Sequence, residues 1–371
     1  MTIVITCIPS PYQVELFDAV ARHEPDFSAV YVSRHDRSRS WRDTRLQHDA
    51  IFLDEASDAY NVLLQLMSSA DLVVFADYSS GQVRNAMRRR ESVGKPWCFW
   101  GERPGYRGLG GLGRLWRRIH LAPLHRSPQA AIWGIGKWAV DEYRQEFGTG
   151  RLYFNFPYVS DLDRFRVTGA CRSSTGSLRI LYSGALINRK GVDLLASAFR
   201  RLAQTYQHVS LSVVGSGPLR PVMARLLGPA AAHTVFHDFI PWSDLPMLYA
   251  EADVLCAPSR YDGWGLIVPE GMAAGMPVVA TDRMGAALEL IEPGKNGWLV
   301  TAGSESHLYE ALCAAAELSP SGRAAMGVAA QSRGLQQDVR AGVQRFREAQ
   351  EATLRAWHDS RDGALMGVAA Q

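Results

Sequence analysis

The sequence predicts an α/β fold with two doubly wound parallel sheets. Short apolar runs rich in β-branched residues alternate with longer amphipathic stretches along most of the 371 residues, as strands and helices do in α/β domains. A chain of this length accommodates about two domains of roughly 150 residues each. A stretch rich in Ser, Thr, Gly and Asp interrupts the alternation at residues 158–177 and predicts an interdomain linker.

The first predicted domain, residues 1–157, opens with a β-α-β unit. Residues 2–8 are apolar without polar alternation, which is typical of a strand buried on both faces of a parallel sheet. Apolar residues then recur at helical spacing over residues 14–20, and residues 27–32 resume a strand pattern. Further strands are expected at residues 71–76, 97–100, 131–133 and 152–156. These elements predict a Rossmann-like domain.

The second predicted domain, residues 178–334, repeats this organisation. Its strands are expected at residues 178–183, 209–214, 234–236, 253–257 and 277–281. Residues 335–371 follow as a helix and tail, which we expect to pack back toward the first domain. Val339, Val343, Phe346 and Leu354 lie on one side of that helix. The two domains are expected to face each other across a cleft.

Charge and cysteine content exclude several classes of protein. Forty Lys and Arg against 37 Asp and Glu give a net charge of +3, so nucleic acid is not an expected partner. The five cysteines are scattered without a C-x-x-C pair, which argues against a disulfide framework or a zinc site. A signal peptide and an apolar run of about 18 residues are both lacking. We therefore expect a cytoplasmic protein, soluble or peripheral at the inner face of the cell membrane.

The stretch of residues 84–126 is strongly basic, with eleven Lys and Arg against two Glu. Bulky apolar residues are interleaved with these charges, namely Trp97, Trp100, Tyr106, Leu112, Leu115, Trp116 and Ile119. Basic and aromatic residues together favour contact with anionic lipid head groups or with a lipid-diphosphate acceptor. A solvated basic face is the alternative.

The most informative segment, residues 259–281, follows one predicted strand and opens a helix. Gly263 and Gly265 allow the backbone to approach a ligand closely, and amides at a helix start favour a phosphate. Asp262 and Glu270, eight positions apart, can then hold hydroxyl groups on either side of that phosphate. An ordinary glycine-rich turn with incidental acids is the alternative.

This segment resembles the signature of the retaining family-4 glycosyltransferases of the GT-B fold, also called glycosyl transferases group 1. The family signature is a Glu, seven residues and a second Glu. Asp262 stands at the first Glu, which in the family contacts the donor sugar, and Glu270 keeps the second, which binds the ribose hydroxyls. The resemblance places Trp264 and Leu266, with the two glycines, beside the nucleotide sugar.

Residues 181–195 resemble the strand, glycine turn and Lys-Gly helix start of the same family. The resemblance implies that the turn at Gly184 approaches the donor. It also implies that Arg189 and Lys190 bind the diphosphate. Two cations there would stabilise the leaving nucleotide, because negative charge builds on the departing oxygen as the glycosidic bond breaks.

Two more segments resemble parts of the family that contact the nucleotide. Residues 213–219 resemble a strand ending in Gly-x-Gly-Pro, and Gly215 and Gly217 are expected to border the nucleotide. The dinucleotide fingerprint is incomplete here, which makes a nicotinamide dehydrogenase a distant alternative. Residues 236–254 resemble the family segment whose turn receives the base, and Phe239 is the candidate contact there.

The first domain is expected to bind the acceptor and to supply a polar catalytic residue. Many relatives have a His after about the fourth strand, and this chain has Glu102 in a comparable setting. Glu102 would orient the acceptor or stabilise charge at the sugar. A structural ion pair with Arg103 or another basic neighbour is the alternative.

The resemblance implies a retaining hexosyltransferase, with a UDP-sugar favoured over a GDP-sugar and a glycan or lipid-linked acceptor. No metal and no further cofactor are expected. A nucleotide-sugar 2-epimerase on the same fold is one alternative, and it would consume the donor without an acceptor. A catalytically silent nucleotide-sugar-binding partner subunit is another, and the Asp at position 262 keeps it open.

Overall fold

The computed structural model describes residues 1–35, 45–55, 58–104, 111–166, 177–238, 240 and 244–368. The chain forms two compact units. Unit 1 comprises Met1–Ser160 and Val339–Gln371, and unit 2 comprises Asp161–Asp338. The chain therefore passes from unit 1 to unit 2 after Ser160 and returns after Asp338. None of the helices within the described ranges has both the length and the apolar character needed to cross a bilayer.

Unit 1 is built on a parallel sheet with the strand order β3-β2-β1-β4-β5-β6-β7. Its strands are β1 (Thr2–Thr6), β2 (Phe27–Tyr31), β3 (Asp49–Phe52), β4 (Leu72–Phe75), β5 (Trp97–Gly101), β6 (Ala131–Gly134) and β7 (Tyr153–Asn155). The central strand β1 is buried along its whole length, because helices cover both faces of a doubly wound sheet. The order reverses between β1 and β4.

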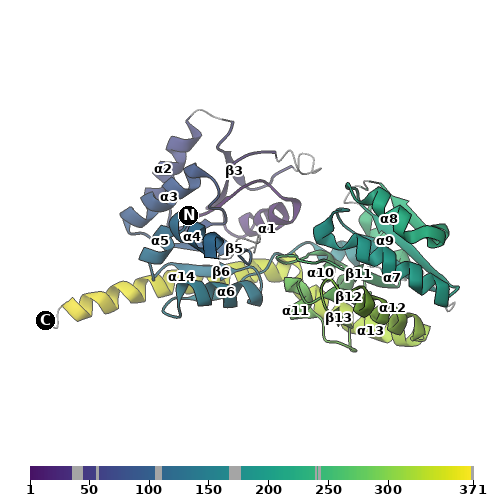
Figure 1. Cartoon of the computed structure of the whole chain (residues 1–371). Coiled ribbons are helices and arrows are strands. Elements are labelled where there is room, and N and C mark those ends of the chain that lie inside the picture. Colours follow the sequence, from purple (N-terminus) through teal and green to yellow (C-terminus); the bar gives the residue numbers. More distant parts are fainter. Residues whose placement is uncertain are drawn as a thin grey trace. The chain divides into compact units, whose positions relative to one another are not determined.

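The helices of unit 1 are α1 (Pro11–Ala21), α2 (Ala59–Ser69), α3 (Gly81–Val93), α4 (Gly111–His120), α5 (Ala122–Arg126), α6 (Lys137–Phe147) and α14 (Val339–Val368). Helix α14, yellow in Figure 1, packs against α1 and β6. Its buried Phe346 meets the edge of Trp133, whose indole NH donates to the Thr353 hydroxyl at 2.9 Å. The C-terminal helix therefore completes the core of unit 1.

Unit 2 contains a second parallel sheet, with the order β10-β9-β8-β11-β12-β13. Its strands are β8 (Leu178–Ser183), β9 (Val209–Val214), β10 (Thr234–His237), β11 (Val254–Ala257), β12 (Val278–Thr281) and β13 (Gly297–Val300). Its α-helices are α7 (Val192–Thr205), α8 (Arg220–Leu227), α9 (Leu245–Glu251), α10 (Ile267–Ala273), α11 (Gly285–Leu290), α12 (Glu305–Glu317) and α13 (Pro320–Gly334). The described residues of unit 2 also form the 3₁₀ helices η1 (Leu162–Phe165), η2 (Asn188–Lys190), η3 (Gly228–His233) and η4 (Leu335–Gln337).

The two parallel sheets confirm the fold class predicted from the sequence. Each predicted strand has a counterpart within a few residues, whereas the edge strands β3 and β13 were not predicted. The predicted C-terminal helix from residue 335 is divided, since the 3₁₀ turn η4 precedes α14.

Candidate functional site

The carboxyl ends of β8 and β11, where the strand order of unit 2 reverses, bring three predicted site residues together. This is the position at which open α/β sheets bind ligands. The Lys190 ammonium pairs with one oxygen of the Asp262 carboxylate, and the Arg189 guanidinium lies 3.6 Å from the other. Lys190 is 19% exposed and Asp262 14%, so the pair is largely shielded from water. Two cations at this edge can bind an anionic group.

A second ion pair fixes the two loops that carry these residues. The Arg260 guanidinium donates to both carboxylate oxygens of Asp193, at 2.7 Å each. The backbone NH of Arg260 donates to the Arg189 carbonyl at 2.8 Å. Hydrogen bonding from Arg260 lowers the pKa of Asp193 below its ordinary value, so the carboxylate stays ionised near neutral pH. The loop with the cations is therefore tied to the loop with Asp262.

Glycines allow the backbone segments of this site to lie unusually close together. Gly191 has φ +68°, and a Cβ there would lie 2.0 Å from the Pro258 carbonyl oxygen. At the end of β9, a Cβ on Gly215 would lie 2.1 Å from the carbonyl oxygen of Gly184. A Cβ on Gly217 would similarly meet the Leu186 carbonyl oxygen at 2.5 Å. The predicted glycines of the two loops thus lie side by side at the ends of β8 and β9.

Glu270 lies in α10 and is half-buried. The hydroxyl of Tyr249 donates a hydrogen bond of 3.2 Å to its Oε2 atom. Tyr249 itself is completely buried, and the Ser183 side chain at the end of β8 lies beside the same hydroxyl. Glu270 is therefore held at the carboxyl edge of the sheet that also carries Lys190 and Asp262.

The remaining predicted residues of unit 2 lie in the loop before α10. Trp264 is buried, and its backbone carbonyl accepts from the Ala286 amide at 2.9 Å, so its indole belongs to the core. Gly263 is also buried, whereas Gly265 and Leu266 are half-exposed beside Asp262 and before the helix. Phe239 lies outside the described residues.

Glu102 belongs to unit 1, directly after β5, and its side chain is exposed. The Tyr158 hydroxyl hydrogen-bonds the Glu102 carboxylate and the hydroxyl of Tyr12. The rings of Tyr12 and Tyr158 lie 4.7 Å apart. Burial, Tyr12 and Glu102 raise the pKa of Tyr158, which keeps its hydroxyl protonated. A carboxylate and two aromatic rings thus meet at the carboxyl edge of the first sheet.

Arg103, the expected alternative partner of Glu102, instead forms an ion pair of 2.8 Å with Glu142. Its guanidinium also lies 3.5 Å above the ring of Trp138. Tyr143 contacts Glu102 through the backbone, donating to its carbonyl oxygen at 2.7 Å.

The basic stretch of residues 84–126 is only partly a surface. Arg90 is buried and donates to the carbonyl oxygens of Met67, Asp71 and Pro96, and burial lowers its pKa to about 10. Arg117 forms an ion pair with Glu146, and Arg126 forms one with Glu91. Trp97 and Trp100, expected among the interleaved surface residues, are core residues of β5. Tyr106, Arg107 and the Leu112 side chain lie outside the described part.

Helix α4 nevertheless exposes an apolar ridge. Leu115 is 55% exposed, Trp116 46% and Ile119 63%. Arg114 and Arg118 are exposed on the same helix. These three exposed apolar side chains make α4 the apolar part of the basic stretch that the structure places at the surface.

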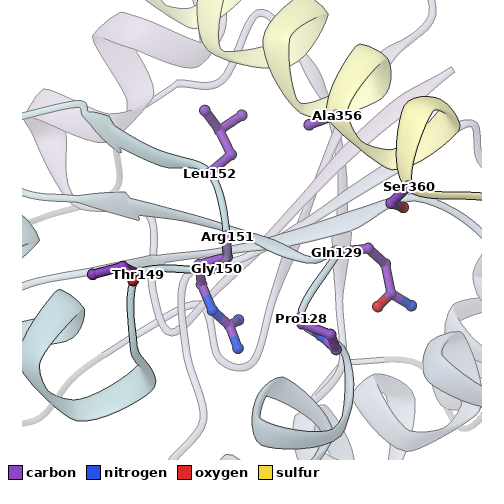
Figure 2. A pocket seen from close by; sticks show the side chains of 8 residues that line it. All are labelled: Pro128, Gln129, Thr149, Gly150, Arg151, Leu152, Ala356 and Ser360. Atoms are coloured by element: carbon purple, nitrogen blue, oxygen red, sulfur yellow. The ribbon is translucent and has the colours of Figure 1, made fainter. Parts of the chain in front are cut away.

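A cavity of about 590 Å³ lies elsewhere in unit 1. Figure 2 shows the residues that line it: Pro128 and Gln129 before β6, Thr149, Gly150, Arg151 and Leu152 before β7, and Ala356 and Ser360 of α14. It therefore lies at the amino ends of these strands, the edge opposite to Glu102. None of the predicted site residues lines it.

Sequence reasoning did not identify Tyr249, Arg260, Asp193 or Tyr158 as parts of the site. Each acts through a partner far away in the sequence, such as Arg260 with Asp193, 67 positions apart. No local motif indicates such a pair, and only the fold brings the partners together.

Known proteins similar to this chain are glycosyltransferases. Residues 177–317 match the model of the family described as glycosyl transferases group 1. A GDP-mannose-dependent alpha-(1-6)-phosphatidylinositol monomannoside mannosyltransferase of Mycolicibacterium smegmatis is 30% identical over 211 residues. The match covers 53% of this chain and 55% of that protein. The chain thus spans about half the length of the curated relatives it matches.

Solved structures resemble the chain over nearly its whole length. Anabaena HepE, crystallised with UDP, superposes with a TM-score of 0.75 at 18% identity, covering 95% of this chain and 100% of HepE. Sucrose-phosphate synthase of Thermosynechococcus elongatus gives a TM-score of 0.73 at 15% identity, covering 96% of this chain and 100% of that one. At these identities the likeness establishes the fold alone.

Proposed function

Because the chain belongs to the group 1 glycosyltransferases of the GT-B fold, we propose that it is a retaining hexosyltransferase. It would move a hexose from a nucleoside diphosphate sugar to a glycan or lipid-linked acceptor, in the assembly of a cell-surface polysaccharide or glycolipid. The observation that carries this proposal is the cluster of Lys190, Arg189 and Asp262 at the switch point of the second sheet.

In the proposed donor complex, Lys190 and Arg189 bind the diphosphate, Asp262 contacts the hexose and Glu270 binds the ribose hydroxyls. The spacing supports these roles, since Asp262 already lies within ion-pair distance of both cations. The two candidate bases are uracil and guanine. The sequence favours UDP, whereas the mycobacterial relative is named as GDP-mannose-dependent.

In the proposed reaction, the acceptor hydroxyl attacks the anomeric carbon of the hexose. It approaches from the same face of the sugar from which the phosphate leaves. The bond from the anomeric carbon to the phosphate oxygen breaks, the bond to the acceptor oxygen forms, and the acceptor proton passes to the departing phosphate. Lys190 and Arg189 stabilise the charge that builds on that phosphate. Because the cations come from the protein, we propose that no metal ion is needed.

We propose that the acceptor binds at the carboxyl edge of the first sheet. There the Glu102 carboxylate can accept a hydrogen bond from a sugar hydroxyl, while Tyr12 and Tyr158 offer ring faces. Exclusion of water from the bound donor would protect it from hydrolysis.

We also propose that the enzyme is cytoplasmic and contacts the inner face of the cell membrane through α4. The exposed Leu115, Trp116 and Ile119 would enter the interface, and Arg114 and Arg118 would meet anionic head groups. A lipid-linked acceptor would then be presented at the surface where the enzyme binds.

Calorimetric titration with UDP, GDP, ADP and NAD, with a chelator present, tests the donor assignment. We expect one nucleoside diphosphate to bind, and Glu270→Ala to weaken binding at least about tenfold, as loss of a charged hydrogen-bond partner does. Preference for NAD, or no nucleotide binding by folded protein, would contradict the proposal. Donor consumption without any acceptor would instead identify an epimerase.

A further inference from the structure

The hydroxyl of Tyr249 lies where three elements of unit 2 meet. Tyr249 belongs to α9, Ser183 ends β8, and Glu270 belongs to α10. The Tyr249 hydroxyl donates to Glu270 Oε2 at 3.2 Å, and the Ser183 side chain lies beside the same hydroxyl. No sequence motif assigns a role to this tyrosine.

The direction of this hydrogen-bond chain follows from the number of protons available. A tyrosine hydroxyl has one proton, and here it is given to Glu270. The Ser183 hydroxyl, beside the same tyrosine oxygen, can then act toward it only as a donor. Burial and the nearby Glu270 carboxylate raise the pKa of Tyr249, so its hydroxyl remains a donor throughout the physiological pH range.

The tyrosine ring is fixed as well as its hydroxyl. Tyr249 is completely buried, and its ring lies 4.9 Å from that of the buried Phe165 in η1. A ring held on all sides adopts one orientation, and its hydroxyl can act as a fixed point for a neighbouring side chain. Glu270, by contrast, is only half-buried and has a flexible side chain.

We propose that Tyr249 is a positioning residue that fixes the Glu270 carboxylate for recognition of the ribose diol, and so sets the preference for ribonucleotides. This inference rests on the proposed function, in which Glu270 binds the ribose hydroxyls. A carboxylate held in one orientation loses less freedom when it accepts two hydroxyl groups at once. Removing the tyrosine hydroxyl takes away one contact that orients the carboxylate, so we expect the advantage of the diol to be reduced.

The test compares ribonucleotides with their deoxy counterparts. Wild type, Tyr249→Phe and Tyr206→Phe are titrated with UDP, GDP and the 2′-deoxy and 3′-deoxy forms of each. Tyr206 is the matched control, because its hydroxyl also donates to a glutamate, Glu317, at 2.7 Å but at the C-terminal end of α7. Thermal melting of each variant reports its folding.

We expect Tyr249→Phe to weaken ribonucleotide binding about three- to tenfold, which is less than the effect of Glu270→Ala because Tyr249 acts on the nucleotide only through Glu270. Binding of the deoxy forms should change less than about twofold, so the ribose preference shrinks. Tyr206→Phe should leave the preference unchanged. A purely structural role for Tyr249 would weaken all the nucleotides equally, and this result would overturn the inference.

The other outcomes separate this inference from the proposed function. If wild type binds no nucleoside diphosphate, the proposed function fails, and the inference fails with it. If wild type binds ribonucleotides preferentially and Tyr249→Phe retains the full preference, only the inference fails. If Tyr249→Phe does not fold, Ser183→Ala decides the matter, because it removes the donor to the tyrosine and should reduce the same preference by about half as much.

Discussion

The side chains of Lys190 and Asp262 form an ion pair across the carboxyl ends of β8 and β11, although 72 positions separate them in the sequence. In the proposed donor complex the same ammonium binds the diphosphate, while the same carboxylate contacts the hexose. Asp262 therefore has two effects on Lys190. It holds the cation at this edge of the sheet, and in the proposed complex it would compete with the phosphate for the cation's charge.

The competition predicts that Asp262→Asn separates binding from catalysis. Without the carboxylate, Lys190 has one fewer anionic partner, so affinity for a nucleoside diphosphate should rise about fivefold, equivalent to about 1 kcal/mol. Turnover with the nucleotide sugar should fall at least about tenfold, because the contact with the hexose is lost. Calorimetry and a steady-state transfer assay measure the two effects.

Asp262→Glu is the matched control for this variant, since it keeps the charge and restores the residue type of the family signature. Its affinity for the nucleoside diphosphate should stay within about twofold of wild type, because the ion pair is retained. Equal affinities of wild type and Asp262→Asn would show that the ion pair does not compete with the diphosphate.

Gly191, directly after the 3₁₀ turn that carries Lys190, should not tolerate a side chain. A Cβ there would lie 2.0 Å from a backbone oxygen of Pro258, which cannot rotate away. We expect Gly191→Ala to destabilise unit 2 by about 2 kcal/mol or more, from overlap and left-handed backbone strain together. Urea unfolding measures the loss.

Gly303→Ala separates strain from overlap. Gly303 has a similar φ of +84°, but a Cβ there would meet no atom within 4 Å. This control should cost only about 1 kcal/mol. If both variants lose the same stability, the close approach of Gly191 to Pro258 is not what requires glycine.

The ion pair between Arg260 and Asp193 predicts an acid-sensitive contribution to stability. Hydrogen bonding from Arg260 lowers the pKa of Asp193 from its ordinary 3.8, so the contribution is complete above that pH and is lost as the pH falls through the lower folded-state pKa. Because the side chains are 31% and 27% exposed, we expect about 1 kcal/mol. The difference in melting temperature between wild type and Arg260→Gln should be constant from about pH 5 to 7 and shrink below about pH 4.

Calorimetry between about pH 3 and 7 measures this difference. Arg201→Gln controls for the loss of one surface charge, since it breaks the more exposed pair of Arg201 with Glu305 in the same unit. It should lower the melting temperature less than Arg260→Gln does. If the difference in melting temperature between wild type and Arg260→Gln stays the same size down to pH 3, the ion pair with Asp193 is not the source of the acid-sensitive stability.

The sequence predicts the central strands of both described sheets, whereas it predicts the edge strands β7 and β10 but misses the edge strands β3 and β13. Strands such as β1 are apolar throughout because both faces are covered, and this leaves a continuous signal. The unpredicted β3 begins with the exposed Asp49, and β13 begins with Gly297 and has two half-exposed residues. An edge strand needs few apolar residues, so its pattern resembles that of a loop.

The candidate site was predictable where a motif is local and was missed where it is assembled by the fold. The Lys190 and Asp262 segments each have a recognisable pattern of glycines and charges, and the structure brings them together. Tyr249 and Arg260 lie within recognised segments, but the local pattern assigns them no role, because their roles depend on Glu270 and Asp193, which lie in other segments. For the basic stretch of residues 84–126, the local charge pattern predicted a surface where the fold does not make one throughout. Arg90, one of the counted basic residues, is buried.

The exposed ridge on α4 predicts that membrane binding depends on apolar side chains as well as on charge. Leu115→Ser combined with Ile119→Ser should reduce binding to vesicles containing phosphatidylglycerol at least about tenfold, because partial burial of two such side chains contributes more than about 1.4 kcal/mol. Vesicle sedimentation measures the bound fraction. Raising the salt concentration should weaken wild-type binding, since Arg114 and Arg118 interact with head groups through screened charges.

Val328→Ser in α13 is the matched control, because Val328 is 71% exposed but belongs to unit 2 and not to the α4 ridge. It should bind vesicles as wild type does. Neutral phosphatidylcholine vesicles should bind wild type weakly, since they offer the ridge an apolar interior but no anionic head groups. If the double variant binds anionic vesicles as tightly as wild type, the ridge does not enter the membrane and exposed arginines alone account for binding. If wild type binds neither kind of vesicle, α4 does not contact the membrane.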